Sequence, residues 1–247
     1  MKHRSGFLKA FDVLGVVLAA SVVLAWMYGL QVRNWYRARE LTRTRPAVSL
    51  VPRPLADARV ANGKGTTLAA FGYQMDVPWS DLQEHQGTSA VAVFLFTGGV
   101  GLRFWNPATT SGAVALMREE VEQTKRNFTG FLGARTEYEF LNAELNATPK
   151  QFSPFMNKNE AFREGLLLNM KWFEVAREPS AMYSLARNGL RGFQLGDPSI
   201  DRIVEIRSFD DDEREFRFLF AVERGSNVKI EQGEINKLIQ SLRPARR

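Results

Sequence analysis

The chain has 247 residues and a net charge of +6, and 45% of its residues are hydrophobic and 24% charged. This composition is typical of a folded protein, and the length suits one domain or at most two small ones. Cysteine is absent and histidine occurs only as His3 and His85, which excludes disulfides and cysteine metal sites and argues against histidine-based metal or acid–base chemistry.

The positive charge is concentrated near the N-terminus. Ten of the 33 Lys and Arg residues lie at or before Arg59, against three of the 27 acidic residues. The remaining 23 basic and 24 acidic residues nearly cancel. Because a nucleic-acid-binding domain needs clustered Lys and Arg on its own surface, we expect no nucleic-acid partner.

Val13 to Leu30 reads VLGVVLAASVVLAWMYGL and contains no charged residue. With its apolar flanks, this run as a helix nearly spans a hydrocarbon core of roughly 30 Å. A backbone in lipid must satisfy its own hydrogen bonds, which leaves helix as the available structure. We therefore expect residues 1–31 to form a short tail and a transmembrane anchor, with the lipid bilayer as a partner.

Aromatic side chains gather at the C-terminal end of this run, where the interfacial belt of a membrane helix lies. The expected membrane-interface residues are Trp26, Tyr28, Trp35 and Tyr36. A cleaved signal peptide is the alternative, because a basic start, an apolar core and a small-residue site at residues 23–25 also fit it. The apolar run continues to Leu30 and then into a basic helical pattern, which favours an uncleaved anchor.

We expect a single-pass protein of a bacterial inner membrane. Short N-terminal tails of such proteins usually stay in the cytoplasm, which would place the domain outside it. The positive-inside rule opposes this, since three Lys/Arg residues precede the run and five follow soon after it. We keep an extracytoplasmic domain as the expectation and leave the orientation open.

Residues 32–67 contain an arginine-rich stretch followed by Pro46, Pro52 and Pro54. Proline prevents both helix continuation and central-strand pairing, so this segment is predicted to be a partly extended, solvated spacer. Its arginines could contact anionic lipid headgroups or act only as a topological flank. Residues 68–247 show no further long linker and are expected to form one globular domain.

The first half of this domain is expected to be mainly strands. The alternation over residues 71–77 predicts a strand that stops at Pro78. Ser80 and Gln83 have capping-box spacing, which predicts a short helix through His85. The apolar run over residues 90–96 predicts a strand buried on both faces. The glycines of residues 98–101 lack the Lys-Ser/Thr ending of a phosphate loop and are interpreted as a turn.

The second half is expected to alternate helices and hairpins. Residues 112–128, 139–147, 159–168 and 230–242 have helical patterns, and residues 170–175 read as a strand. Asn188-Gly189 separates two strand patterns and predicts a tight hairpin. A second hairpin is predicted from residues 202–209 and 215–222, with Phe216, Phe218 and Phe220 on one face. Its acidic tip, residues 210–213, lacks calcium-loop spacing and is interpreted as a solvated turn.

No sequence motif identifies an enzyme. There is no Ser/His/Asp set, no nucleophile elbow and no histidine metal motif, so we expect no catalytic residue, cofactor or metal site. An enzyme would require carboxylates to converge in a deep pocket with shifted pKa values. The candidates for such convergence are Asp76, Asp81, Glu84, Glu119 and Asp197.

Three features together resemble the PsbP-like α/β domains. They are the Phe71-Gly72-Tyr73 strand that ends at Pro78-Trp79, the two hairpins over residues 183–195 and 204–222, and a closing helix with Ile239-Gln240-Ser241-Leu242-Arg243. The resemblance covers about residues 68–243. It implies an antiparallel sheet between helices and a non-catalytic binding, assembly or stabilising role on a membrane complex.

These observations predict an α+β fold: one N-terminal transmembrane helix, then a domain with a mostly antiparallel sheet packed against helices. The expected function is a non-catalytic accessory or interaction module at the membrane surface, with a protein partner. The alternative is a membrane-tethered enzyme, a hydrolase that uses carboxylates.

Overall fold

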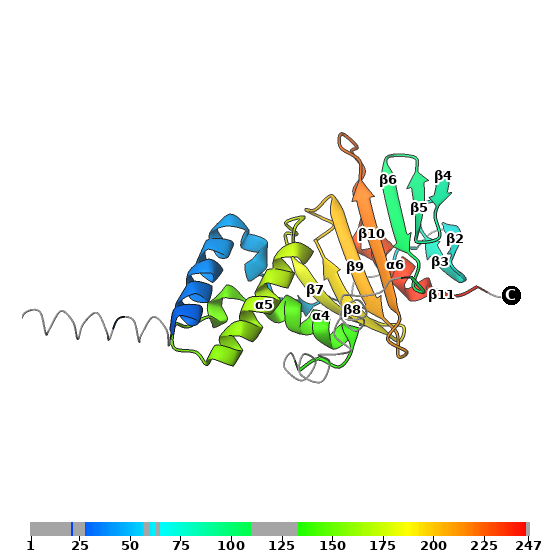
Figure 1. Ribbon diagram of the computed structural model, residues 1–247. Coiled ribbons are helices and arrows are strands. Elements are labelled where there is room, and N and C mark those ends of the chain that lie inside the picture. The colour runs from blue at the N-terminus through cyan, green and yellow to red at the C-terminus, as the bar shows by residue number, and fades with distance from the viewer. Residues whose placement is uncertain (1–20, 22–27, 57–59, 63–64, 110–132, 246–247) are drawn as a thin grey trace, which may run out of the picture.

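Figure 1 shows the computed structural model, which describes residues 21, 28–56, 60–62, 65–109 and 133–245. Within these residues, no helix is both long and apolar enough to cross a membrane. The expected membrane helix over Val13 to Leu30 lies outside the described residues except at Ser21 and residues 28–30. The helix expected over residues 112–128 also lies outside them.

A large, mostly antiparallel sheet forms the centre of the domain. Its strands, in order across the sheet, are β1 (Arg53–Pro54), β7 (Met182–Arg187), β8 (Leu190–Leu195), β9 (Ile203–Phe209), β10 (Glu215–Val222), β6 (Val100–Trp105), β5 (Val91–Phe96) and β4 (Leu82–Gly87). Every neighbouring pair is antiparallel except β1 and β7. The expected α+β class with a mostly antiparallel sheet is therefore confirmed.

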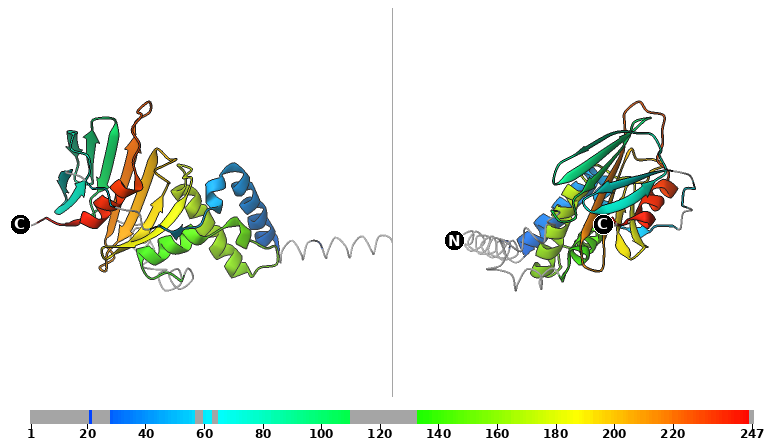
Figure 2. Two further views of the ribbon diagram at one scale, coloured as in Figure 1. Left: turned by 180° about the vertical axis from the view of Figure 1, so that it is seen from behind. Right: turned by 90° about the vertical axis from the view of Figure 1, so that its right-hand side faces the viewer.

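One face of this sheet is covered by α6 (Gln232–Ser241) and a second, small sheet. The small sheet contains β2 (Thr66–Ala70), β3 (Tyr73–Val77) and β11 (Arg243–Pro244), and Figure 2 shows it beside α6. The core between these layers is rich in phenylalanine. Phe104 and Phe218 stack there with ring centroids 4.7 Å apart.

Helices cover the other face of the sheet over β7, β8 and β9 (Figure 1). They are the helical residues 28–44, the 3₁₀ turn η1 (Pro46–Ser49), α4 (Glu137–Asn146), the 3₁₀ turn η2 (Pro149–Gln151) and α5 (Lys158–Glu174). A second core lies between these helices and the strands. Phe193 and Phe209 of the sheet pack there with Leu141 of α4, Leu168 of α5 and Ala38 of helix 28–44.

The segment 32–67 differs from the solvated spacer that its prolines and arginines predict. Ala38 and Val48 are fully buried, and β1 pairs in parallel with β7. Pro46 occupies the first turn of η1, where the missing N–H costs nothing. Small side chains such as Ala38 and Ala47 make the buried contacts, while Trp35, Leu41 and Leu50 pack at the edge of the second core.

Helix 28–44 and α5 lie side by side and run in the same direction. The Asn34 side-chain amide donates to the carbonyl of Ala161 at 2.9 Å, and Arg45 donates to the carbonyl of Trp172 at 3.3 Å. Gly165 allows this approach, because a Cβ there would lie 2.7 Å from Asn34 Nδ2. Residues 28–44 are thus packed onto the domain.

Two element predictions are wrong. Residues 82–87 form β4, paired with β5, rather than a short helix, because pairing within this hairpin overrides a local capping signal. Residues 170–174 continue α5 rather than forming a strand, since Leu167, Lys171 and Val175 share one buried helical face. In addition, β5 is buried on one face only, as its alternating burial shows.

The two hairpins are confirmed. Asn188 and Gly189 have φ angles of 53° and 73°, as a two-residue turn of this type requires. The strand β10 lies between β9 and β6, and Phe216, Phe218 and Phe220 point into the first core. The C-terminal helix, α6, covers that core with Ile235, Leu238 and Ile239.

Candidate functional site

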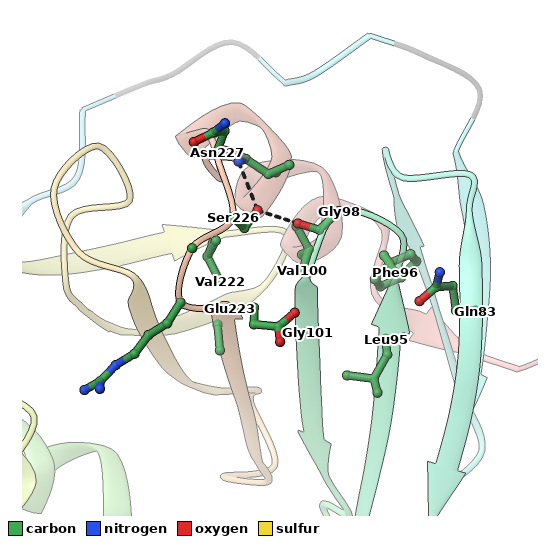
Figure 3. Close-up of a pocket in the computed structure, with 15 residues that line it drawn as sticks. Gln83, Leu95, Phe96, Gly98, Val100, Gly101, Val222, Glu223, Ser226 and Asn227 are labelled. Atoms are coloured by element: carbon green, nitrogen blue, oxygen red, sulfur yellow. Dashed lines mark hydrogen bonds between the residues drawn. The ribbon is translucent and has the colours of Figure 1, made fainter.

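An open groove of about 960 Å³ lies between the β5–β6 turn and the chain that follows β10. Figure 3 shows its lining, which combines backbone with apolar side chains. Leu95 and Val228 project there and are 37% and 39% exposed. The groove is at the end of the sheet that is remote from helix 28–44 (Figure 1).

Glycines form one wall of the groove for a steric reason. Gly98 and Gly99 have φ angles of 91° and 80°, a region that favours glycine. A Cβ on Gly99 would lie 2.9 Å from the Cβ of Glu223, and a Cβ on Gly98 would lie 3.0 Å from Val228. Larger residues would therefore push the two walls apart.

Hydrogen bonds fix the groove in shape. The Glu223 amide donates to the carbonyl of Gly99 at 2.8 Å. The Ser226 hydroxyl donates to the carbonyl of Gly98 and accepts from the Val228 amide at 3.1 Å (Figure 3). These bonds join the β5–β6 turn to the segment after β10, so the groove is formed before any partner arrives.

The groove offers contact surface rather than acid–base chemistry. Among the described residues that line it, Glu223 carries the one carboxylate and Arg224 the one cationic group, and both are exposed. Catalytic acid–base groups usually converge in a pocket that is shielded from water, whereas these two side chains face solvent at the rim of the groove. The site is therefore suited to binding.

The outward face of β5 continues from the groove as an apolar strip. Val91, Val93 and Leu95 alternate with buried neighbours; the two valines are partly buried, and Leu95 is 37% exposed. Trp105 of β6 lies beside Val91 in the strand register and is partly buried. We call the groove together with Val91, Val93 and Leu95 the distal surface.

Charged side chains are buried beneath α5 on the opposite half of the sheet. Arg207 of β9 is paired with Glu215 at 2.5 Å and with Glu174 at 3.0 Å. Burial alone would lower the pKa of Arg207, but these carboxylates raise it, so the guanidinium stays charged. The Glu205 carboxylate likewise accepts hydrogen bonds from the guanidinium groups of Arg177 and Arg217.

Glu144 and Lys171 are buried, and the pKa of each lies far from its ordinary value. Burial, together with the charge of Glu174, raises the pKa of Glu144 to about 8. Burial lowers the pKa of Lys171 to about 8. The ammonium of Lys171 donates to the carbonyls of Leu145 at 2.7 Å and Ala147 at 2.8 Å, and also to that of Leu50.

Glu144, Glu174 and Arg207 also line a small pocket of about 140 Å³ between α4, α5 and β9. Ligand pockets usually measure roughly 300–1,000 Å³, so this one is too small for a typical substrate. Glu144 Oε1 has no hydrogen-bond partner within the described part of the chain. The arrangement is therefore interpreted as a buried charge network that holds α4 and α5 against the sheet.

The carboxylates singled out from the sequence do not form this pocket. Asp76 is paired with Arg243 on the small sheet, and hydrogen bonding from Arg243 lowers its pKa. Asp197 follows β8, where the Ser199 hydroxyl lowers its pKa. Asp81 and Glu84 are exposed at β4. These four residues line none of the pockets described above, and Glu119 lies outside the described residues.

Glu144 and Lys171 were missed, although a signal for each exists. Glu144 shares a helical face with Phe140 and Leu141, and Lys171 shares one with Leu167 and Val175. A charged residue at such a core position is itself the indication of a buried partner. Within the described residues, no cluster of three or more metal-ligating side chains occurs.

The expected membrane-interface residues lie in different surroundings. Tyr36 is 66% exposed on helix 28–44. Trp35 is partly buried against the second core, with the Arg39 guanidinium 4.0 Å above its ring, so packing within the domain already accounts for it. Tyr28 lies edge-on to Phe155, and Trp26 lies outside the described residues.

Comparison with known proteins does not assign the chain to a family. No protein-family model, curated protein or solved structure matches the chain. The resemblance to PsbP-like domains therefore stays a prediction, and the function has to be argued from the molecule alone.

Proposed function

We propose that this chain is a membrane-anchored, non-catalytic interaction module of a bacterial inner membrane, which binds a protein partner through the distal surface. The observation that carries the proposal is the distal surface itself. It is an open groove, bounded by glycine backbone, that continues into the partly exposed apolar strip of β5. Contiguous exposed apolar surface of this kind marks protein interaction sites more often than catalytic ones.

The rigidity of the groove supports binding to a partner. Its walls are tied by the hydrogen bonds of Glu223 and Ser226 to the β5–β6 turn. A preformed surface loses little conformational entropy when it binds, so a modest contact area can give useful affinity. Its charged groups, Glu223 and Arg224, are at the rim, where such residues contribute to specificity.

The anchor supports a location at the membrane. The uncharged run ends at Leu30, inside helix 28–44; that helix is bonded to α5 through Asn34, and its Ala38 is buried in the second core. A membrane helix over Val13 to Leu30 would then continue directly into the domain, without a flexible tether. The domain would be held at a fixed height, with the distal surface directed away from the anchor.

Site-specific photocrosslinking tests the proposal. A photoreactive amino acid at Val228 of the full chain, in the membranes of its native host, should give one discrete protein adduct. The same substitution at Ile200, which is 71% exposed outside the distal surface, should give none. Absence of an adduct at Val228, Leu95 and Val93 alike, with normal protein levels, would rule out the distal surface as the interface.

The second candidate is the membrane-tethered, carboxylate-dependent hydrolase. The observation in its favour is the proximity of Glu144, whose pKa is raised, to Glu174 and Arg207 in one pocket. That pocket would have to open well beyond its 140 Å³ to admit a substrate. We therefore favour the interaction module.

A further inference from the structure

Phe155 is 83% exposed, more than any other large apolar side chain of the described residues. It lies in the short loop between η2 and α5, at the end of the helical layer where helix 28–44 begins (Figure 1). Its ring is edge-on to that of Tyr28, with the centroids 6.3 Å apart and the planes at 75°. Single exposed apolar side chains are common on proteins, but Phe155 is distinguished by its contact with Tyr28, which lies in the uncharged run of residues 13–30.

The parallel packing of helix 28–44 against α5 determines which part of helix 28–44 lies beside Phe155. Tyr28 contacts Phe155, Asn34 bonds to Ala161, and Arg45 bonds to Trp172. Each pair is separated by the same 127 residues, so helix 28–44 and α5 run level with one another. Phe155 is therefore level with Tyr28, at the end of the uncharged run.

The surroundings of Phe155 have the composition of a membrane-surface segment. Residues 149–164 contain three basic residues, Lys150, Lys158 and Arg163, against two acidic residues, Glu160 and Glu164, and Arg163 is paired with Glu164 at 2.8 Å. Phe162, the fifth residue of α5, is a further aromatic residue and is 54% exposed. Aromatic side chains at the acyl boundary with basic residues among the headgroups are the usual pattern of interfacial binding.

We propose that the loop of residues 152–157 forms a second membrane contact, in which Phe155 inserts into the bilayer surface beside Tyr28. This inference rests on the anchoring that is part of the proposed function. One helix alone leaves a domain free to tilt and to rotate about the anchor axis. A second contact restricts both motions and sets the direction in which the distal surface faces.

The absence of cysteine makes a direct test possible, because any introduced cysteine is the one thiol in the chain. A nitroxide label is attached to F155C in the full chain, reconstituted into lipid discs of neutral and anionic phospholipid, which leave both faces open to water. Electron paramagnetic resonance then measures collisions with oxygen, which concentrates in lipid, and with a water-soluble nickel chelate. F173C and I200C are the matched controls, since Phe173 and Ile200 are 68% and 71% exposed.

We expect the label at residue 155 to collide several-fold more with oxygen than with nickel, and the labels at 173 and 200 to show the reverse. Phe173 lies one position before the C-terminal end of α5, 18 residues beyond Phe155. At a rise of about 1.5 Å per residue along α5, the label at 173 would be far from the membrane surface. A water-exposed label at 155 in discs that retain the protein would overturn the inference and leave the anchor intact. Failure of the chain to enter the discs would instead remove the anchoring, and this inference with it.

Discussion

Lys171 shows how a single buried charge can join three segments. Its ammonium donates to carbonyls of Leu145 and Ala147 at the end of α4 and to that of Leu50 after η1. Carbonyls at a helix C-terminus lack partners within the helix and carry partial negative charge, so a cation there is favoured. The bonds compensate for removing the ammonium from water, and they tie α4 and the N-terminal segment to α5.

Replacing Lys171 with Met should therefore lower the free energy of unfolding by about 2–4 kcal/mol, because three carbonyls lose their donor. Lys150 is exposed, and its replacement with Met should cost less than about 0.5 kcal/mol. Denaturant unfolding of the full chain in one mild detergent measures both. Equal stability of the two variants would show that the Lys171 bonds contribute nothing.

Glu144 makes stability depend on pH. Burial and the charge of Glu174 raise its pKa from the ordinary 4.5 to about 8. Between these values the folded protein holds a proton that the unfolded chain has released, so stability falls as pH rises from 4.5 to 8. Below pH 4.5 both states are protonated and this contribution is constant. Lys171, with its pKa lowered from 10.5 to about 8, acts in the opposite direction above pH 8.

The variant Glu144→Gln should remove most of this loss, since glutamine imitates the protonated acid at every pH. We expect stability equal to that of the native chain near pH 4, and an advantage that grows to about 4 kcal/mol by pH 8. Thermal unfolding across this range, in a single detergent, is the measurement. Parallel pH profiles for the two proteins would contradict the shifted pKa.

At the scale of elements, β10 forms the centre of the first core. Phe218 is fully buried and stacks on Phe104, so truncating it to Ala should cost roughly 3–5 kcal/mol. Phe173 is 68% exposed, and the same truncation there should cost less than about 0.5 kcal/mol. Similar, small losses at both positions would mean that β10 is displaced by one residue or lies at the periphery.

Residues 28–56 should be required for folding, because they complete the second core. A fragment that begins at residue 28 retains the contacts of Ala38 and Val48 with the helical layer, whereas one that begins at Gly65 exposes that layer. We expect the longer fragment to unfold cooperatively and the shorter one to aggregate. A cooperative thermal transition of the shorter fragment, equal to that of the longer, would restore the view of residues 32–67 as a spacer.

The sequence correctly predicted the elements whose structure depends on neighbouring residues in the chain. Asn188-Gly189 accepts positive φ angles, and the phenylalanines at residues 216, 218 and 220 alternate, so both hairpins follow from short stretches. The elements that it did not predict depend on distant partners. The strand β4 exists through its pairing with β5, and helix 28–44 is held by Ala161 and Gly165, more than a hundred residues away.

The candidate site was less predictable than the fold. The distal surface combines Gly98 and Gly99 with Ser226 and Val228, which meet only after β10 has paired with β6. The glycines were visible as a turn, but nothing in the sequence indicates which segment faces them. Glu144 and Lys171 were detectable in principle, since each breaks an otherwise apolar helical face.

At the scale of the whole molecule, the helical layer and the distal surface lie at opposite ends of the large sheet (Figures 1 and 2). The membrane contacts that we propose, near Tyr28 and Phe155, belong to the helical end. The groove beside Val228 belongs to the other end. This separation would let one face of the domain bind lipid while the other stays accessible to a protein partner.

We propose above that Val13 to Leu30 remains in the mature protein as a membrane anchor. The direct measurement is N-terminal sequencing of the mature chain, recovered from membranes washed at alkaline pH. We expect a chain that stays with the membranes and still carries residues 13–30. A mature protein that begins at or near Trp26, and is released by the wash, would contradict it.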